Sequence, residues 1–417
     1  MSLSYNISTP KTVFLAAQTL SSHHRRCSAP NLPRRILVFS LHSERGVEFD
    51  VGDVFFREES RTGRDLAILS AALYKQTNSN LRVLDAMCGS GARSCRYLAQ
   101  SEADFVLAND GNESARDLIV KNLERVDQSS NRRWNVTHRD ANRLLSECYL
   151  NKDFFDLIDV DSFGSDSMFL RSAMLALKVG GFLYLTNTDG YTSGGHRPNH
   201  SLAAYGAYVR PMPYCNELGL RMLIGGAVRE ASILGLQILP IFSYYSFHGP
   251  VFRVMLRLLR GKMSEESYYG FTSYCRNCGN SQSFTWNDLG KISCVCTGNE
   301  VCRTLSVSGP LWTGPLHDAS HVKEMLKLSE QWGWTDLETV LKQMIEESDP
   351  RLPCGFVKMD EVSKRAKVNS PSMKTFISAL NKEGYVTSRS HIASNVIKTD
   401  CSMANCIRIA KELQCQC

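Results

Sequence analysis

Apolar residues change their spacing repeatedly between positions 64 and 188. Short apolar runs predict strands at 81–86, 105–109, 134–138, 155–160 and 182–188. Apolar positions three or four residues apart predict helices at 64–76, 92–99, 113–126 and 168–177. Strands that alternate with helices are typical of a parallel sheet covered by helices. The pattern therefore predicts an α/β fold.

Beyond residue 188 the pattern predicts a hairpin and then a helical region. A long helix at 216–234 precedes apolar runs at 237–245 and 251–259, which would close the sheet as a hairpin and end an α/β domain spanning 50–262. Further helices are predicted at 322–332, 336–347, 358–366 and 370–383, followed by a basic two-strand wing from 384. This order predicts a winged-helix-like domain at 316–400, which leaves 401–417 as a tail.

Composition excludes several classes of protein. The chain has 417 residues, of which 43% are hydrophobic and 22% charged, so it is neither disordered nor collagen-like, and it is long enough for two or three domains. The longest apolar stretch, 218–242, contains Arg221, Arg229 and Glu230, which argues against a membrane span.

The net charge of +6 is concentrated at the N-terminus. Residues 1–43 hold five basic residues and no acidic ones, which leaves 43 basic and 42 acidic residues in the rest of the chain. An acid-free segment with Ser and Arg but no long apolar stretch is typical of an organellar transit peptide. Pro30 and Pro33 interrupt any long amphipathic helix, which favours a chloroplast address, with the mitochondrion as the alternative. A disordered tail also fits this composition.

Acidic residues end three predicted strands next to a glycine turn. Asp85 ends the first strand and is followed by Gly89 and Gly91, while Asp110 and Asp140 end the next two. Ligands of open α/β sheets bind at this edge, where Asp110 could accept from a ribose diol and Asp140 from an adenine amine. An acid facing the ligand suits the cationic S-adenosylmethionine better than a pyrophosphate. Alternatively, each acid is a solvated residue at a strand end or caps a helix.

The fourth strand ends in a carboxylate next to an aromatic ring. Asp161 and Phe163 would lie near the methyl group of such a cofactor. The carboxylate could accept an N–H of a planar amine substrate while the ring stacks on it. The alternative is a buried acid that caps the following helix.

Taken in order, the motifs after residue 50 resemble those of the tRNA guanine-26 N2-dimethyltransferase family. They are Val54-Phe55-Phe56, Gly63-Arg64-Asp65-Leu66, Leu84-Asp85, Ser90-Gly91-Ala92-Arg93-Ser94, Ala108-Asn109-Asp110, Asp140-Ala141-Asn142, Asp159-Val160-Asp161-Ser162-Phe163-Gly164, Thr186-Asn187-Thr188-Asp189, Tyr274-Cys275-Arg276-Asn277-Cys278, Ser308-Gly309-Pro310-Leu311-Trp312, Ser388-Arg389-Ser390-His391 and Ile397-Lys398-Thr399-Asp400. The resemblance implies a Rossmann-like methyltransferase sheet with a Cys-rich insert and a C-terminal winged-helix-like domain.

The resemblance also implies roles for individual residues. Asp161 would be the catalytic acid/base, and Phe55 and Phe163 would sandwich a guanine that has been flipped out of the tRNA. S-adenosylmethionine would be bound by Arg64, Arg93, Asp110, Asp140 and Ala141, in addition to Asp85 and Gly89 of the glycine turn. The product would be N2-methyl- or N2,N2-dimethylguanosine at tRNA position 26.

The sequence departs from the family pattern at two places. Ser162 stands where the family usually has proline, so the proline's fixed φ is lost from the floor of the base pocket. Arg57-Glu58 replaces the Asn-Pro that usually follows the Val-Phe-Tyr motif.

The segment 263–315 contains five cysteines in a stretch of 28 residues: Cys275, Cys278, Cys294, Cys296 and Cys302. The Cys-x2-Cys pair followed by further thiols is typical of a structural zinc site. We expect the ligands to be Cys275, Cys278, Cys296 and Cys302, because thiolates only two residues apart would strain a tetrahedron. Metal-free thiols remain the alternative.

A tRNA partner requires a local basic surface, because the bulk charge is near neutral. Candidates are Arg253, Arg257, Arg260 and Lys262 in one predicted strand, and Arg389-Ser390-His391 in the wing. The strand row could instead be an ordinary solvated face. We expect a monomer that binds tRNA and no membrane. Two other functions remain open: a methyltransferase for another RNA position or amine, and a non-catalytic RNA-binding paralogue.

Overall fold

The computed structural model describes residues 41–262, 268–294, 296 and 304–415. Its centre is a seven-stranded sheet in the order β5-β4-β3-β6-β7-β9-β8. The strands are β3 (Arg82–Asp85), β4 (Phe105–Asn109), β5 (Trp134–Thr137), β6 (Phe155–Asp161), β7 (Leu177–Asn187), β8 (Leu236–Ser246) and β9 (Val251–Arg260). The first five are parallel, and β9 pairs antiparallel with both β7 and β8. The predicted α/β fold and its closing hairpin are confirmed.

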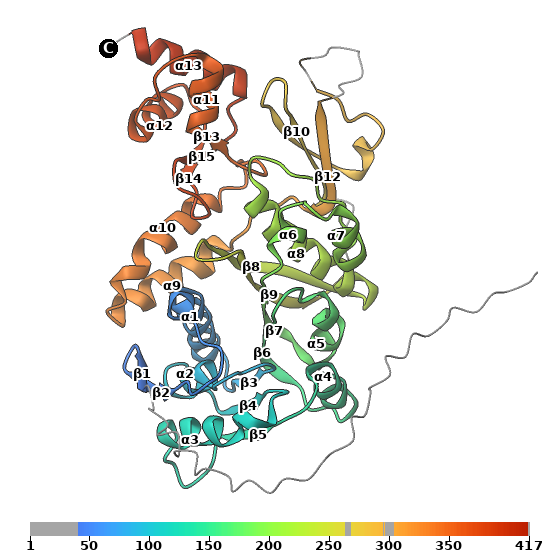
Figure 1. The fold of residues 1–417 in the computed structure, drawn as a ribbon, viewed down its shortest axis with the longest axis vertical. Coiled ribbons are helices and arrows are strands. Elements are labelled where there is room, and N and C mark those ends of the chain that lie inside the picture. The colour runs from blue at the N-terminus through green and yellow to red at the C-terminus, as the bar shows by residue number, and fades with distance from the viewer. Residues whose placement is uncertain (1–40, 263–267, 295, 297–303, 416–417) are drawn as a thin grey trace, which may run out of the picture. The chain divides into compact units, whose positions relative to one another are not determined.

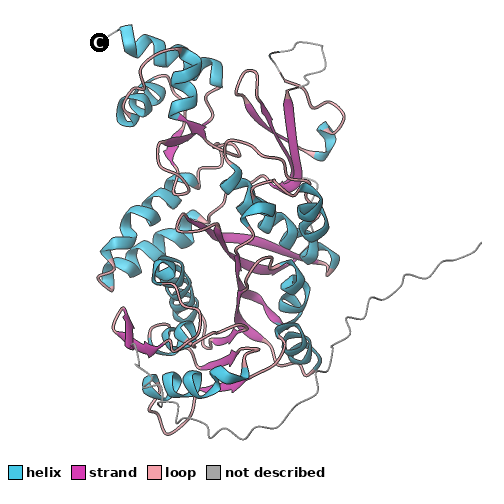
Figure 2. Ribbon diagram, in the orientation of Figure 1, coloured by secondary structure: helices cyan, strands magenta, loops and turns pink. Residues whose placement is uncertain are grey.

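Helices cover both faces of this sheet (Figures 1 and 2). One face packs against α1 (Arg61–Thr77), α2 (Ala92–Ala99) and α3 (Arg116–Val126). The other packs against α4 (Ala141–Leu150), α5 (Leu170–Ala176) and α8 (Cys215–Ile233), with the short α6 (Gly190–Ser193) and α7 (Pro198–Tyr205) beside α8. Because both faces are covered, the residues of the central strands β3 and β6 are almost all buried, including Asp85, Asp156 and Asp159. No helix among these described residues is long and apolar enough to cross a membrane.

The hydrophobic pattern did not predict several short elements. β1 (Leu41–Glu44) and β2 (Val47–Asp50) form a small hairpin whose residues are largely polar, and the predicted leader boundary at 43 falls inside β1. Helix α4 begins directly after Asp140. Single turns of 3₁₀ helix lie at Glu58–Ser60, Glu113–Ala115, Ser167–Phe169, Trp286–Asp288 and Thr335–Leu337.

The Cys-rich segment contains a three-stranded antiparallel sheet that periodicity did not predict. It consists of β10 (Tyr269–Cys275), β11 (Ser281–Phe284) and β12 (Leu305–Trp312), in the order β11-β10-β12. Strand β12 lies against α8 at Gly225, where a Cβ atom would come within 2.9 Å of Leu311 Cα. The missing side chain thus lets the insert pack directly on the sheet's helical cover.

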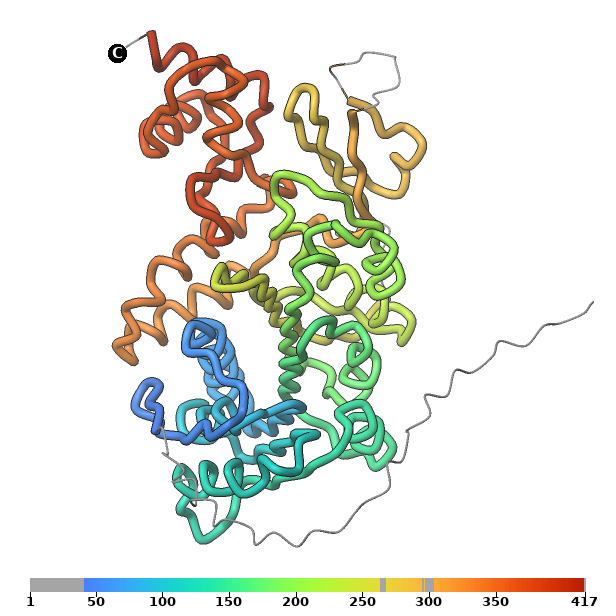
Figure 3. Tube along the Cα trace, in the orientation of Figure 1, coloured from blue at the N-terminus to red at the C-terminus, as the bar shows by residue number. Residues whose placement is uncertain are grey.

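The predicted C-terminal domain divides into two packing groups (Figure 3). Helices α9 (Ala319–Gln331) and α10 (Glu338–Glu347) share the core that covers the α1 face of the large sheet. A separate core contains α11 (Met359–Ala366), α12 (Met373–Lys382) and α13 (Met403–Cys415). Its small sheet is β13 (Val357–Lys358), β15 (Val396–Thr399) and β14 (Thr387–Arg389). The helix, helix and wing order therefore holds from residue 357, and the segment read as a tail contains α13.

Candidate active site

A cavity of about 770 Å³ opens at the carboxyl ends of β3, β4 and β6. Eight residues predicted from the sequence line it: Phe55, Arg64, Asp85, Gly89, Arg93, Asp110, Asp161 and Phe163. They come from the loop after β2, the start of α1, and three strand ends with the turns that follow. The parallel strands gather these residues because their carboxyl ends meet at one edge of the sheet.

The glycine turn holds Asp110 in a fixed orientation. Gly89 (φ +58°) and Gly91 (φ +82°) adopt left-handed backbone conformations that side chains disfavour. The Gly89 backbone N–H donates to Asp110 Oδ2 at 2.8 Å, and the Asn112 N–H donates to Oδ1 at 2.8 Å. Each carboxylate oxygen keeps a second lone pair for a ligand. The turn and Asp110 therefore form a preorganised wall that can accept hydrogen bonds from a diol.

Asp85 is a buried acid with one unsatisfied oxygen. Its Oδ2 accepts from Ser94 Oγ at 2.7 Å, while Oδ1 has no partner among the described residues. Burial, together with the nearby charge of Asp159, raises the pKa of this carboxyl well above its usual range. A bound cation would offset that penalty, so this part of the cavity suits a positively charged ligand group.

Asp161 is held by Arg93 at the cavity wall. Arg93 Nη1 donates to the buried Asp159 Oδ1 at 2.6 Å, and its Nη2 forms an ion pair with Asp161 Oδ2 at 2.7 Å. Burial raises the pKa of the Asp161 carboxyl, but the positive charges of Arg93 and Arg253 outweigh it and hold the pKa below its usual range. The Asp161 side chain is still 36% exposed. The site thus presents an ionised carboxylate that a substrate can reach.

Two phenylalanines stand exposed beside this carboxylate. Phe55 is 62% exposed and Phe163 is 75% exposed, an unusual state for such large apolar side chains. Their ring centroids are 5.1 Å apart, at an interplanar angle of 75°. Such an edge-to-face contact leaves no gap for a planar base, so a base would enter between them only after one ring turns. Ser162, which stands where the resemblance led us to expect proline, donates from Oγ to the Thr186 carbonyl at 3.1 Å.

Arg64 is anchored by a residue that the sequence did not indicate. Its Nε donates to Glu44 Oε2 at 2.9 Å, and Glu44 also accepts from Arg96. Arg64 Nη2 donates to the Arg57 carbonyl at 3.1 Å. The hydrophobic pattern missed Glu44 because it belongs to β1, a largely polar strand that shows no alternation of apolar residues. The Arg64 side chain is therefore fixed from behind while it lines the cavity.

Asp140 and Ala141 lie outside the residues that line the cavity. Asp140 is the N-cap of α4, and its Oδ1 accepts from the Arg143 N–H at 2.9 Å. Oδ1 of Asp140 thus caps the helix, as the alternative interpretation of this acid expected.

The predicted basic surface is wrong at two residues. Arg253 is only 2% exposed and lines the cavity, instead of lying on a solvated strand face. His391, in the wing, has a fully buried side chain whose Nδ1 lies 2.9 Å from Glu347 Oε2. Arg257 lies over the Phe182 ring, with its guanidinium carbon 5.1 Å from the centroid. Period-2 alternation shows which residues share a face, but it does not show what covers that face.

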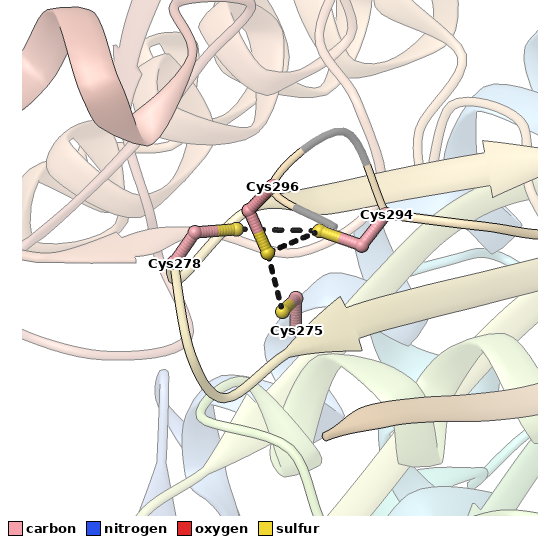
Figure 4. A group of neighbouring side chains, drawn as sticks. All are labelled: Cys275, Cys278, Cys294 and Cys296. Carbon is pink, nitrogen blue, oxygen red and sulfur yellow. Dashed lines mark hydrogen bonds between the residues drawn. The ribbon is translucent and has the colours of Figure 1, made fainter. Parts of the chain in front are cut away.

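Four thiols gather at the end of β10 (Figure 4). The Sγ atoms of Cys275, Cys278, Cys294 and Cys296 all lie within 4.8 Å of one another. Cys294, which the strain argument excluded, lies 3.4 Å from the Cys278 sulfur and 3.3 Å from the Cys296 sulfur. Cys302 lies outside the described residues. Burial opposes ionisation of Cys275, yet the Cys278 backbone N–H and other donors bring the pKa of its thiol down to about 6.

The fold and the cavity together define an α/β methyltransferase. Residues 40–411 match the sequence profile of the family described as N2,N2-dimethylguanosine tRNA methyltransferase. This match covers most of the chain, and the chain belongs to that family.

Named relatives and a solved structure agree with this assignment. A tRNA (guanine(26)-N(2))-dimethyltransferase of Thermococcus kodakarensis is 30% identical over 365 residues, covering 83% of this chain and 90% of the relative. Its counterpart in Methanosphaera stadtmanae is 28% identical over 355 residues, covering 83% and 88%. The structure of Trm1 from Pyrococcus horikoshii with S-adenosyl-L-methionine is similar, with a TM-score of 0.76 and 26% identity over 88% of this chain and 99% of that one.

Proposed function

We propose that this chain transfers methyl groups from S-adenosylmethionine to N2 of guanosine at tRNA position 26, giving N2-methyl- and N2,N2-dimethylguanosine. The observation that carries the proposal is the ionised Asp161 carboxylate, held by Arg93 beside the exposed rings of Phe55 and Phe163. A carboxylate next to stacking rings suits a base that has left its stack.

The cavity fits the proposed cofactor. The unsatisfied Asp85 Oδ1 would face its cationic methionine end, and Asp110 with the Gly89 turn would hold its ribose. When bound, S-adenosylmethionine supplies an electrophilic methyl group. Arg64 and Arg93 line the same cavity, each anchored to a carboxylate of the protein.

The chain's own groups would act on the guanine amine. The nitrogen is a weak nucleophile because its lone pair is delocalised into the ring. Asp161 would accept an N–H hydrogen bond, orient the amine and take the proton as the new N–C bond forms. Phe55 and Phe163 would stack on the base, and each stack contributes about 1–3 kcal/mol. This interaction would offset the cost of unstacking the base from the tRNA.

Methylation of an unmodified tRNA transcript tests the proposal. After incubation with the protein and S-adenosylmethionine, mass spectrometry of the nucleosides should show both methylated guanosines. A transcript with adenosine at position 26 is the matched control and should gain neither. A protein that binds tRNA and S-adenosylmethionine but methylates no guanosine would be a non-catalytic paralogue.

We also propose one structural zinc ion in the cysteine cluster. Four sulfurs this close match a tetrahedral thiolate site, in which every position is a protein ligand. The site also faces the C-terminal domain: Arg365 donates to the carbonyls of Arg276 and Asn277, which lie between the first two cysteines. Elemental analysis should find about one zinc per chain.

For the N-terminal residues 1–43 we propose a transit peptide with a chloroplast address. The family match starts at residue 40, so nearly all of this segment lies outside the part of the chain that matches the family. Fused to a fluorescent protein, residues 1–43 should direct it to plastids, whereas a mitochondrial signal would support the alternative. We further propose that the enzyme acts as a monomer, because the residues assigned to the cofactor and the base that line the cavity come from one chain.

A further inference from the structure

Asp161 and Arg253 stand in one row across the sheet. Asp161 of β6 pairs in register with Thr186 of β7, and Thr186 pairs with Arg253 of β9. All three residues line the cavity. Neighbouring strands lie about 4.8 Å apart, so one intervening strand separates the carboxylate and the guanidinium at their backbones. The row thus presents an acceptor and a donor to the same space.

The start of α1 is shaped around the Arg253 side chain. At Gly63 a Cβ atom would come within 2.7 Å of Arg253 Cδ and Nε, so only glycine leaves the arginine its path. Arg253 Nη2 donates to Ser60 Oγ at 3.1 Å, and Ser60 also lines the cavity. Gly63 therefore shapes the cavity indirectly, because it leaves room for the side chain of Arg253, almost two hundred positions later in the chain.

Arg253 keeps unused hydrogen-bond donors in a buried position. Its side chain is 2% exposed, and Nε and Nη1 have no partner among the described residues. Arg93, which is also buried, pairs with two carboxylates, whereas the described residues place no carboxylate within ion-pair distance of Arg253. Buried unsatisfied donors are costly and uncommon, so they indicate a ligand that accepts from them.

We infer that Arg253 donates a hydrogen bond to the carbonyl oxygen O6 of the target guanine and so determines base specificity. This inference rests on the proposed function. The Watson–Crick edge of guanine carries two N–H donors, at N1 and N2, and one acceptor, O6. Asp161 would accept from the donors while Arg253 donates to O6. Adenine presents an amine in place of O6, so the same pair of side chains would reject it.

Replacing O6 by sulfur in the substrate tests this role directly. A tRNA with 6-thioguanosine at position 26 keeps both N–H donors but offers only a weak acceptor. For the wild-type enzyme, kcat/KM should fall about tenfold or more from guanosine to 6-thioguanosine, as expected for a lost charge-assisted hydrogen bond. With Arg253→Met, kcat/KM for guanosine should fall to a similar extent, and the two tRNAs should become equivalent. Arg253→Lys, which keeps a charged donor, should restore part of the difference.

Arg257→Met is the matched control, because it removes the same charge four residues along the same strand. It should leave the ratio between the two tRNAs at the wild-type value, whatever happens to tRNA affinity. Binding of S-adenosylmethionine to each variant verifies folding, and if Arg253→Met does not fold, Arg253→Lys decides. An Arg253 variant with the full wild-type ratio would overturn the inference. A wild-type enzyme that leaves guanosine unmethylated would instead overturn the proposed function.

Discussion

The catalytic cavity and the cysteine cluster hold their polar groups in place by different means. In the cavity, partners from the fold fix the carboxylates: the Gly89 N–H fixes Asp110, and Arg93 fixes Asp161. In the cluster, the sulfur atoms contact one another: the Sγ atoms of Cys294 and Cys296 are 3.3 Å apart. Four thiolates so close together would repel one another unless a cation lies between them. The protein's own groups therefore preorganise the cavity, whereas the cluster is where we propose that a zinc ion holds the thiolates together.

The largest expected effect is therefore the loss of metal from the cluster. Cys278→Ser and Cys294→Ser should each abolish stoichiometric zinc, because each leaves the tetrahedral site one thiolate short. Structural zinc binding contributes about 10–16 kcal/mol in zinc-finger peptides, so the loss is expected to be large. Elemental analysis and thermal unfolding would measure the loss. Affinity for S-adenosylmethionine should change little, since no cysteine of the cluster lines the cavity.

Cys302→Ser is the control that separates the two candidate ligand sets. It should retain zinc if the four thiols brought together in the structure are the ligands. Loss of zinc from Cys302→Ser but not from Cys294→Ser would restore the set expected from the sequence.

The second effect concerns chemistry in the preorganised cavity. Asp161→Asn should lower the rate of methyl transfer by about 10²-fold or more, because the amide cannot take the proton. S-adenosylmethionine affinity and tRNA affinity should stay close to wild type. Single-turnover methylation with binding measured in parallel would show the split, and an unchanged rate would remove the role assigned to Asp161.

A smaller effect is expected at Asp110, a carboxylate that would bind the cofactor but take no part in methyl transfer. Asp110→Ala should weaken S-adenosylmethionine binding about tenfold, or 1.4 kcal/mol, through loss of the acceptor held by the glycine turn. Asp117→Ala removes an exposed acid from the first turn of α3 and should leave the affinity unchanged. Calorimetry on both variants would test this, and equal affinities would contradict a binding role for Asp110.

The smallest expected effect is the response of Asp161 to pH. Its pKa is lowered, so the carboxylate stays ionised as the pH falls toward the ordinary value of an aspartate, about 3.9. Single-turnover methylation should therefore show no loss from this group between about pH 8 and 6. An acid limb within that window that disappears in the residual activity of Asp161→Asn would show that the carboxyl titrates there.

Sequence alone determined the strands of the large sheet and much of the cavity. Apolar runs marked the strands, and acids at their ends marked one edge, because parallel strands bring their carboxyl ends together wherever they fold. Asp85, Asp110 and Asp161 line the cavity for this reason. The sequence also predicted correctly that Cys275 and Cys278 lie together in the thiol cluster, because residues three positions apart stay close in space.

Tertiary structure decided which of these groups are covered and what partners they have. Arg253 looked like part of a solvated row, but α1 covers its face of the sheet, and Gly63 leaves room for the guanidinium. Arg64 depends on Glu44 in a strand too polar to recognise. Spacing excluded Cys294, although the chain turns so that its sulfur joins the others. A pattern along the chain records which residues share a face, whereas burial and pairing depend on segments far away in the sequence.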